Sequence, residues 1–481
     1  MRKHRINRRN VLGGASALGV AGLFPRPALA ERTTDGQAPA GGAPLPARGE
    51  FVVRGANVLT MDPALGEFAS GDVHVRDGAI VAVGASVAAP GAEAIDGRGT
   101  ICMPGFIDTH WHLWTSCLRP IVRADNPDRG YFPVTNKLGP HYTPQDSYRS
   151  VRLGLAEALS AGVTTVHNWA HNVRSPAHAD AEIAAMRDTG MRGRFGYGTP
   201  QGLANDQPMD LADLARVKRD LAGDAMISLG IASRNVGRDP NPLRGNITME
   251  MVKKEWGAAR ELGAGITLHT SGPSPVSLLN ETGLLGPDLQ LVHPLLTIAE
   301  ERAMLKERNT SYSIAPVGEA RRPASAGVIQ LGELIEAGVR CSMSTDHSTT
   351  INCDCFVGMR ILNALHQHRI GNRIKVNTRR LVELATIDGA RDLGIADRTG
   401  SLTPGKRADL ILVRTTDINM SPAGDPFESL VGLAQPSNVD TVVVDGRILR
   451  RGGRFAALDH AKVVADAMQS ATELRAKAGW P

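Results

Sequence analysis

Eight short apolar segments, separated by helix-like stretches, constrain the fold of this chain most strongly. Each segment has the length of a buried strand, and most are followed by residues whose apolar side chains repeat every three or four positions. The segments are residues 104–112, 163–167, 194–197, 226–232, 266–269, 289–293, 311–315 and 340–346. Eight strand–helix units in succession predict an α/β fold, the (β/α)8 TIM barrel.

The connecting stretches support this architecture. Helical periodicity is clearest in residues 145–161, 249–262, 298–307 and 327–337. The rival architecture is a doubly wound open sheet. It is disfavoured because no Gly-rich phosphate-binding turn follows any early strand.

The two ends of the chain resemble each other in pattern. Short β-type segments occur at residues 51–53, 72–75 and 79–83, and again at 408–413 and 441–447. Asp77-Gly78 is a typical hairpin turn. We therefore predict that both ends build one small β-sandwich domain. The predicted boundaries are residues 49–100 and 396–455 for this domain, 101–395 for the barrel and 456–481 for a C-terminal helix.

The first 30 residues have the layout of an export signal. A basic stretch containing Arg8-Arg9 precedes a weakly apolar run at 13–24, and Ala28-Leu29-Ala30 offers a small-X-small cleavage site. This pattern predicts a twin-arginine signal cleaved after Ala30, a periplasmic or secreted protein, and the twin-arginine export machinery as a partner. The alternative is a flexible basic terminus without an address. Residues 31–48, rich in Gly, Pro and Ala, are predicted to be a linker.

Composition excludes several classes of function. The hydrophobic fraction of 42% and the charged fraction of 21% are ordinary for a globular protein. The net charge is +5, but six basic residues and no acid lie in residues 1–30, so removal of that segment leaves −1. We therefore expect no nucleic-acid partner and no membrane anchoring. The five cysteines are interpreted as free thiols rather than a disulfide framework.

Histidines and one aspartate close several of the apolar segments. His110 and His112 end the first one, and side chains two apart on a strand share a face. His269, His293 and Asp346 end three later segments. The C-terminal ends of barrel strands meet at one rim, so these five side chains are predicted to converge. Imidazoles and a carboxylate at one place predict a site for a divalent metal ion.

At this point the chain resembles the amidohydrolase superfamily. The resemblance is carried by Pro-Gly-Phe-Ile-Asp-Thr-His-Trp-His at residues 104–112, by the strand-end residues and by the tail at 400–410. It is greatest to the branch of cytosine deaminases and triazine hydrolases. The resemblance implies His110, His112, His269 and Asp346 as ligands of one divalent metal and His293 as a catalytic group. Zinc is the default metal, although iron and manganese accept the same ligands.

These residue types suit hydrolysis. Three neutral imidazoles and a carboxylate leave one coordination position for water, which a divalent ion can acidify to a pKa of about 7. Asp346 can accept the proton and later deliver it to the leaving group. His293 can polarise the bond under attack.

Two departures from the related branch shape the expected function. Gly272 stands where deaminases carry a proton-shuttling glutamate, and residues 226–232 lack the lysine that bridges two metals in other branches. We therefore expect one metal ion and hydrolysis of a non-peptide C–N bond, amide-like or carbamate-like, in a small ring-bearing molecule. One alternative is an aminohydrolase or chlorohydrolase acting on a purine, pyrimidine or triazine ring. Another is a catalytically silent periplasmic metal- or ligand-binding protein.

Candidate substrate contacts follow the strand ends. The connection at 113–142 has the length of a lid, and its Trp114, Tyr131 and Phe132 supply aromatic surface. Arg119 matches a position that the family uses for substrate, although a solvated arginine is the alternative. His167 and Gln201 follow the second and third strands and could also contact substrate, with a structural role as the alternative for His167. A homo-oligomer is left open.

Overall fold

The computed structural model describes residues 44–119, 121–123, 125–237, 246–270, 274–370 and 376–480. The predicted export signal, most of the predicted linker and Gly272 lie outside these residues, so the statements made about them stay predictions. Within the described ranges, no helix combines the length and the apolar character that a membrane span requires.

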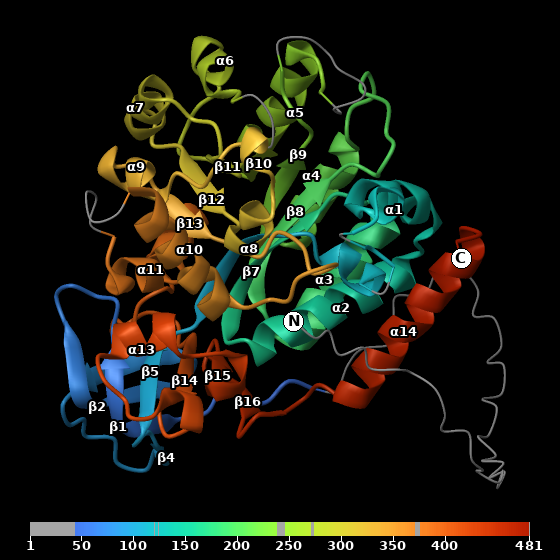
Figure 1. Cartoon of the computed structure of the whole chain (residues 1–481). Coiled ribbons are helices and arrows are strands. Elements are labelled where there is room, and N and C mark those ends of the chain that lie inside the picture. The colour runs from blue at the N-terminus through green and yellow to red at the C-terminus, as the bar shows by residue number, and fades with distance from the viewer. Residues whose placement is uncertain are drawn as a thin grey trace, which may run out of the picture. The chain divides into compact units, whose positions relative to one another are not determined.

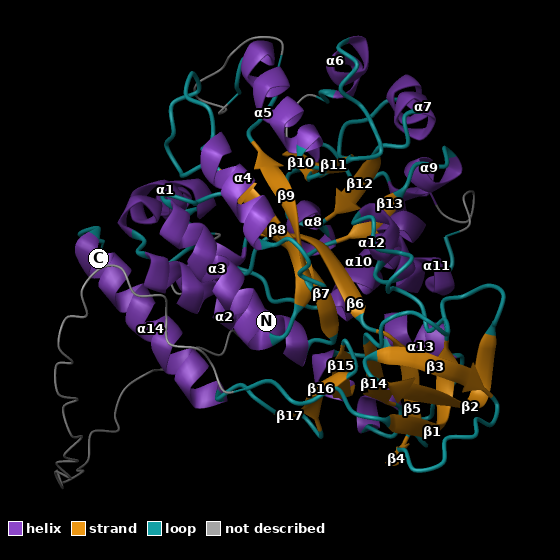
Figure 2. Ribbon diagram, turned by 180° about the vertical axis from the view of Figure 1, so that it is seen from behind, coloured by secondary structure: helices purple, strands orange, loops and turns teal. Residues whose placement is uncertain are grey.

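Eight parallel strands form a barrel, as predicted. They are neighbours in sequence order and are surrounded by helices, as Figures 1 and 2 show. The strands are β6 (Phe106–Trp111), β7 (Val163–Ala170), β8 (Arg192–Gly198), β9 (Ile227–Ser233), β10 (Gly265–His269), β11 (Leu289–Val292), β12 (Ser311–Ile314) and β13 (Cys341–Met343). The longer helices that follow these strands are α2 (Pro144–Ser160), α3 (Pro176–Thr189), α4 (Leu211–Asp220), α5 (Met249–Glu261), α7 (Ala299–Glu307) and α10 (Cys355–Ile370). Buried apolar side chains of strands and helices form one continuous core.

The barrel closes between its first and last strands through an isolated bridge, not a full ladder. Trp111 and Asp346 form this bridge in parallel orientation. The Asp346 N–H donates to the His110 carbonyl at 2.9 Å, and the His112 N–H donates to the Asp346 carbonyl at 2.7 Å. The residues predicted to bind metal therefore also close the barrel.

The chain ends form a second, mostly antiparallel sheet, which confirms that both ends build one β structure. Its strands run in the order β17-β16-β15-β14-β5-β1-β2-β3, with β4 paired to β1. They are β1 (Phe51–Leu59), β2 (Glu67–Arg76), β3 (Ala79–Gly84), β4 (Glu93–Asp96), β5 (Thr100–Pro104), β14 (Leu410–Arg414), β15 (Val439–Val444), β16 (Arg447–Arg451) and β17 (Arg454–Phe455). The described residues form one compact unit, so the domain boundaries stay predictions.

The predicted hairpin turn lies between β2 and β3. Asp77 and Gly78 both have positive φ, 51° and 83°. Two consecutive positive φ values are the signature of the type I′ turn, which matches the twist of the flanking strands.

Two predicted segments differ from the structure. The helix expected at 327–337 is shorter, α9 (Leu331–Glu336), because Gly327 adopts φ 103°, outside the helical region. The lid expected at 113–142 is not an irregular loop. It contains η1 (Leu113–Leu118) and α1 (Tyr131–Leu138), and α14 (His460–Lys477) contributes Leu474 to the apolar cluster beside it.

A buried ion pair joins the barrel to the second sheet. Arg192 on β8 donates two hydrogen bonds to the Asp409 carboxylate, next to β14, and the two side chains are 3% and 1% exposed. Asp409 also accepts the N–H of Asp445 at 2.7 Å. The pair therefore anchors the returning C-terminal segment against a barrel strand.

Replacing Asp409 by Asn is expected to lower the free energy of unfolding by about 3 kcal/mol, because it leaves the buried Arg192 charge short of its main partner. Urea denaturation measures this change. The matched control is Asp440→Asn, whose carboxylate pairs with Arg414 near the surface and should contribute about 1 kcal/mol or less. Equal denaturation midpoints for Asp409→Asn and the unmodified protein would contradict the anchoring role.

Candidate metal and catalytic site

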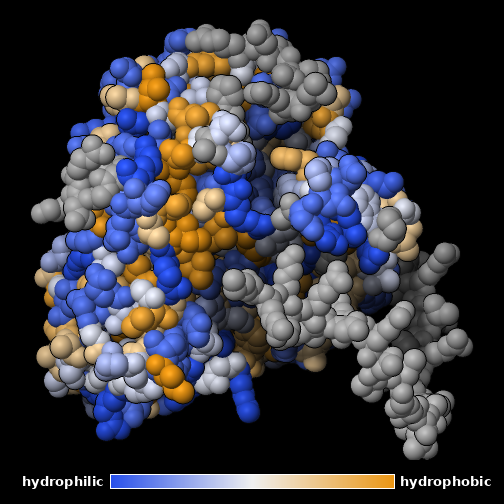
Figure 3. All heavy atoms as spheres, viewed as in Figure 1, coloured by the Kyte–Doolittle hydropathy of each residue, from blue (hydrophilic) through white to orange (hydrophobic). Residues whose placement is uncertain are grey.

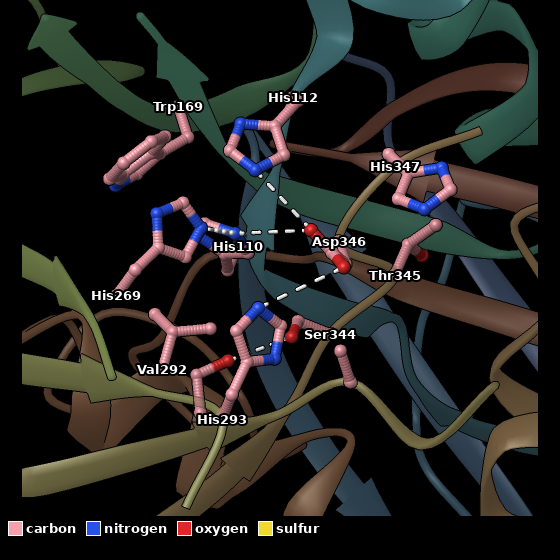
Figure 4. A network of polar contacts seen from close by, with 12 residues as sticks. His110, His112, Trp169, His269, Val292, His293, Ser344, Thr345, Asp346 and His347 are labelled. Atoms are coloured by element: carbon pink, nitrogen blue, oxygen red, sulfur yellow. Dashed lines mark hydrogen bonds and ion pairs between the residues drawn. The ribbon is translucent and has the colours of Figure 1, made fainter. Parts of the chain in front are cut away.

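Three histidines and one aspartate converge at the C-terminal end of the barrel (Figure 4). His110 and His112 come from the end of β6, His269 ends β10, and Asp346 follows β13. One ligand atom from each residue lies within 4.8 Å of all the others. The described residues thus contain a group that could hold one metal ion.

The spacing of the ligand atoms fits one shared ion. Two nitrogens that bind the same zinc ion at about 2.0–2.1 Å lie about 2.9 Å apart when their bonds meet at 90° and about 3.3 Å apart at the tetrahedral angle. In the structure, His110 Nε2 lies 3.1 Å from His269 Nε2, and Asp346 Oδ1 lies 3.3 Å from His112 Nε2 and 3.6 Å from His110 Nε2. The residues present therefore fit a single divalent ion.

Burial prepares these groups for metal binding. It lowers the pKa of His110 to about 4 and of His112 to about 3, and it lowers the pKa of His269 well below the usual value. Burial alone would raise the pKa of Asp346, but nearby His293 and hydrogen bonds from the histidines hold it well below the usual value. At neutral pH the site therefore holds neutral imidazoles and an ionised carboxylate, the protonation states that ligands need.

The backbone is strained at two of the functional residues. His293 and Asp346 adopt φ of 69° and 71°, a region that non-glycine residues enter at a cost of about 1–3 kcal/mol each. Backbone hydrogen bonds hold both conformations: the His293 N–H donates to Ser313 O, and the Asp346 N–H donates to His110 O. At both residues the backbone leaves the extended conformation of the preceding strand, so the positive φ sets the direction of the side chain after the strand end.

Asp108 fixes the relative position of the two ligand segments. Its buried carboxylate accepts hydrogen bonds from the N–H groups of His110 and Thr345, at 3.2 Å and 3.1 Å. Burial raises the pKa of Asp108 to about 7. The same side chain therefore contacts one candidate ligand, His110 on β6, and the residue before another, Thr345 after β13.

His293 is held by a buried glutamate. Glu319, on α8 (Pro316–Ala320), accepts a hydrogen bond from His293 Nδ1 at 2.9 Å and from the Ala315 N–H at 2.8 Å. The side chains of His293 and Glu319 are 2% and 0% exposed. Because Nδ1 donates to the carboxylate, Nε2 is the free nitrogen, and it lies 3.8 Å from Asp346 Oδ2. This arrangement gives His293 a fixed orientation toward the site.

His112 is oriented in turn by His171. His112 uses Nε2 toward Asp346, so Nδ1 is the nitrogen that donates to His171 Nδ1 at 2.9 Å. Trp114 Nε1 donates to the same His171 nitrogen at 3.0 Å. The same nitrogen lies 3.3 Å from the Trp169 carbonyl oxygen, so three polar groups hold the His171 ring beside His112.

A cavity of about 350 Å³ lies over this group. Its wall includes His112, His269, His293 and Asp346, together with the aromatic side chains of Tyr131, Phe132 and Trp169. The remaining wall residues are His171, Thr199, Pro200, Gln201, Gly202, Leu203, Asn205, Ala232, Ser233, Arg234, Asn235, Arg322 and His347. A small ring-bearing molecule fits a cavity of this size and character.

The structure distributes the predicted substrate contacts unevenly. Gln201 lies on the cavity wall, so its contact with substrate stays a prediction. Trp114, Arg119 and His167 do not line the cavity. Trp114 is fully buried against His171, the Arg119 guanidinium pairs with Glu157 of α2, and His167 is enclosed in the barrel with Nδ1 bonded to Thr109 O. These three side chains have structural partners among the described residues, so their contact with substrate stays a prediction that the cavity wall does not support.

Sequence patterns did not reveal several residues of the site. Glu319 lies in the short helix α8 and Arg322 follows that helix, while Arg234 follows β9; none of the three belongs to a sequence motif. His171, four residues after His167 and directly after β7, did carry a signal, since it continues a histidine-containing strand end. Their roles depend on contacts across the barrel rim.

Comparison with known proteins places this architecture in a family. The sequence profile of the Amidohydrolase family matches residues 101–273 and 253–449, well over half of the chain. A 5′-deoxyadenosine deaminase of Methanosarcina mazei is 28% identical over 447 residues, which cover 89% of this chain and 99% of that protein. A 5-methylthioadenosine/S-adenosylhomocysteine deaminase of Pelotomaculum thermopropionicum is 27% identical, with coverage of 88% and 98%.

Solved structures share the fold. An adenosine deaminase of Xanthomonas campestris with bound zinc superposes with a TM-score of 0.79 at 22% identity, covering 90% of this chain and 100% of that one. The atrazine chlorohydrolase of Arthrobacter aurescens, complexed with zinc, gives a TM-score of 0.74 at 20% identity, with coverage of 88% and 100%. The chain belongs to the amidohydrolase family and is a metal-dependent hydrolase of C–N bonds other than peptide bonds.

Proposed function

We propose that this enzyme is an aminohydrolase that releases ammonia from a purine-type ring of a small molecule. The observation that carries the proposal is the likeness to 5′-deoxyadenosine and 5-methylthioadenosine/S-adenosylhomocysteine deaminases over nearly nine tenths of the chain. The aromatic wall formed by Tyr131, Phe132 and Trp169 above the metal-ligand group supports a flat ring as the bound species.

A divalent ion held by His110, His112, His269 and Asp346 would act as a Lewis acid that brings the pKa of water down to about 7. The chain's own groups then manage the protons. Asp346 Oδ1 faces the ligand nitrogens, so Oδ2 is the oxygen left to accept a proton and deliver it to the leaving amine.

His293 supplies the second proton-handling atom. With Nδ1 bonded to Glu319, Nε2 faces both Asp346 Oδ2 and the cavity. The hydrogen bond to Glu319 holds the ring so that Nε2 is placed to exchange a proton with a ring nitrogen bound in the cavity. His293 thus supplies a proton donor for ring chemistry in a chain that carries Gly272 where related deaminases have glutamate.

A second candidate is hydrolysis of an amide-like or carbamate-like bond, which requires no protonation of a ring nitrogen. The observation that favours it is the shortage of acids: Asp346 is the only carboxylate among the described residues that line the cavity. Such a reaction needs one group to carry a proton from water to the leaving nitrogen, and Asp346 suffices for that.

The test is ammonia release by the zinc-loaded enzyme from a panel of adenosine, 5′-deoxyadenosine, cytosine and aminotriazines, alongside activated amides and carbamates. We expect ammonia from the purine compounds, with kcat/KM of about 10⁴ M⁻¹s⁻¹ or more for a good substrate.

Other results would change the conclusion. Cleavage of amides or carbamates without ammonia from any ring would replace the proposal by the second candidate. Chloride release from chlorotriazines alone would identify a chlorohydrolase. A metal-loaded protein that turns over nothing in the panel would contradict both proposals.

A further inference from the structure

One positive charge on the cavity wall, that of Arg322, has no partner among the residues that the structure describes. Arg322 follows α8, and the helix α8 lies near the centre of the view in Figure 1. The side chain of Arg322 lines the same cavity as His293 and Asp346. Arg322 is partly buried. Among the described residues, no hydrogen-bond acceptor and no carboxylate contacts its guanidinium, although its backbone N–H is bonded to Glu319 O.

The neighbouring cations are satisfied, which distinguishes Arg322. The Arg234 guanidinium, also on the wall, forms an ion pair with buried Glu255 at 2.5 Å. Arg321, adjacent in sequence, is exposed and donates to the carbonyl and hydroxyl oxygens of Thr350 at 3.2 Å and 3.0 Å. Both therefore have structural partners.

Apart from Asp346, the described residues of the cavity wall offer no negative charge to Arg322. Asp346 is the only described carboxylate of the wall, and that group belongs to the metal-ligand set. The other polar wall residues, such as Thr199, Gln201 and Asn205, are neutral. An anionic group on a bound ligand would form charge-assisted hydrogen bonds with this guanidinium and so supply the partner that the wall lacks.

We propose that Arg322 binds a carboxylate carried by the substrate, so that the enzyme acts on a ring bearing an anionic substituent. A guanidinium matches the two oxygens of a carboxylate with two parallel hydrogen bonds. A carboxylate is favoured over a phosphate dianion because a carboxylate carries one negative charge, and Arg322 is the one unpaired cation of the described wall. The ring in this inference rests on the proposed function, whereas the anionic group rests on Arg322 alone.

The test uses two matched probes, adenosine 5′-carboxylate and its neutral adenosine 5′-carboxamide, which differ in one terminal group. Binding is measured by isothermal titration calorimetry, which needs no turnover, and ammonia release is measured in parallel. The unmodified enzyme should prefer the carboxylate by about tenfold in Kd, the size of one charge-assisted hydrogen-bonded contact. The preference should shrink between 50 and 500 mM NaCl, about a threefold drop in Debye length.

Arg322→Gln should bring the ratio of the two Kd values to about 1, since the amide keeps a donor but loses the charge. Arg321→Gln is the matched control and should preserve both the ratio and the activity, because Arg321 does not line the cavity. An unchanged ratio in Arg322→Gln, or equal binding of both probes by the unmodified enzyme, overturns the inference.

The remaining outcomes separate this inference from the proposed function. A carboxylate preference that depends on Arg322, without ammonia release, would refute the aminohydrolase and keep the anion site. Ammonia release with no preference would do the reverse. Tighter binding of adenosine monophosphate than of the carboxylate would overturn the carboxylate in favour of a phosphate, and failure of both nucleoside probes to bind would count against both statements.

Discussion

Asp346→Asn is expected to lower kcat/KM by about a thousandfold or more, because it removes the oxygen that accepts and returns the proton in each cycle. The substitution preserves the size of the side chain, so the backbone bridge to His110 and His112 should persist. It also removes the only anionic ligand of the cluster. Steady-state kinetics with the best compound of the panel, together with metal content by mass spectrometry, measure both effects.

The matched control is Asp354→Asn. Asp354 lies in the segment after Asp346, but its Oδ1 accepts the Val357 N–H at the start of α10 and has no contact with the ligand group. Activity within twofold of the unmodified enzyme is expected there. If Asp346→Asn retained full activity with one metal ion bound, the assignment of Asp346 as the proton carrier would be wrong.

Glu319→Ala is expected to reduce kcat by about a hundredfold with little change in KM, because His293 loses the contact that fixes its orientation. Glu319 does not touch His110, His112, His269 or Asp346, so metal content should stay unchanged. Glu319→Gln keeps an acceptor oxygen for His293 Nδ1 but replaces the hydrogen bond to a carboxylate by a weaker bond to a neutral amide. The kcat of Glu319→Gln should therefore lie between those of the unmodified enzyme and Glu319→Ala, about tenfold below the unmodified enzyme.

Glu301→Gln provides a control for disturbance of a buried glutamate. Glu301 is also buried, but it accepts hydrogen bonds from Ser277 and the Ile298 N–H, away from the cavity. Selective ¹⁵N labelling of histidine adds a direct readout, since the tautomer of His293 should change only in the Glu319 variants. A lower melting temperature without any change in kcat would show that Glu319 stabilises the fold alone.

The convergence of the candidate ligands could be predicted because it follows from local pattern. His110, His112, His269 and Asp346 follow apolar segments, and a barrel brings the ends of such segments to one rim. The distance between His110 and His269 along the sequence is irrelevant once the strand order is sequential. The separation of these four residues from His293, which converges with them, came from the family resemblance.

Residues that act through other side chains could not be predicted in the same way. Trp114 was interpreted as a substrate contact because of its position after the first strand, but it is buried and bonded to His171. Arg119 was interpreted likewise, although a glutamate of α2 pairs with it. Glu319 had no signal at all. Such contacts join elements whose mutual rotation depends on packing, which single-sequence periodicity does not specify.

Segment ends were also hard to predict. The last barrel strand stops at Met343, three residues before Asp346, although the apolar pattern extended to that residue. The chain leaves the ladder there because Asp108 binds the Thr345 N–H and Asp346 pairs with the first strand instead. A long-range contact, not local propensity, ends β13.

The bridge between Trp111 and Asp346 limits how this lineage can acquire new chemistry. The backbone of Asp346 is hydrogen-bonded to the backbone of His110 and His112, and these bonds close the barrel. A substitution of Asp346 would therefore disturb the barrel closure as well as the candidate metal site. Selection for a new substrate can change wall residues such as Gln201 and Arg322 with fewer side effects, because they take no part in the barrel closure. Proteins that evolve from this one should therefore keep the four candidate ligands and differ in the outer residues of the cavity wall.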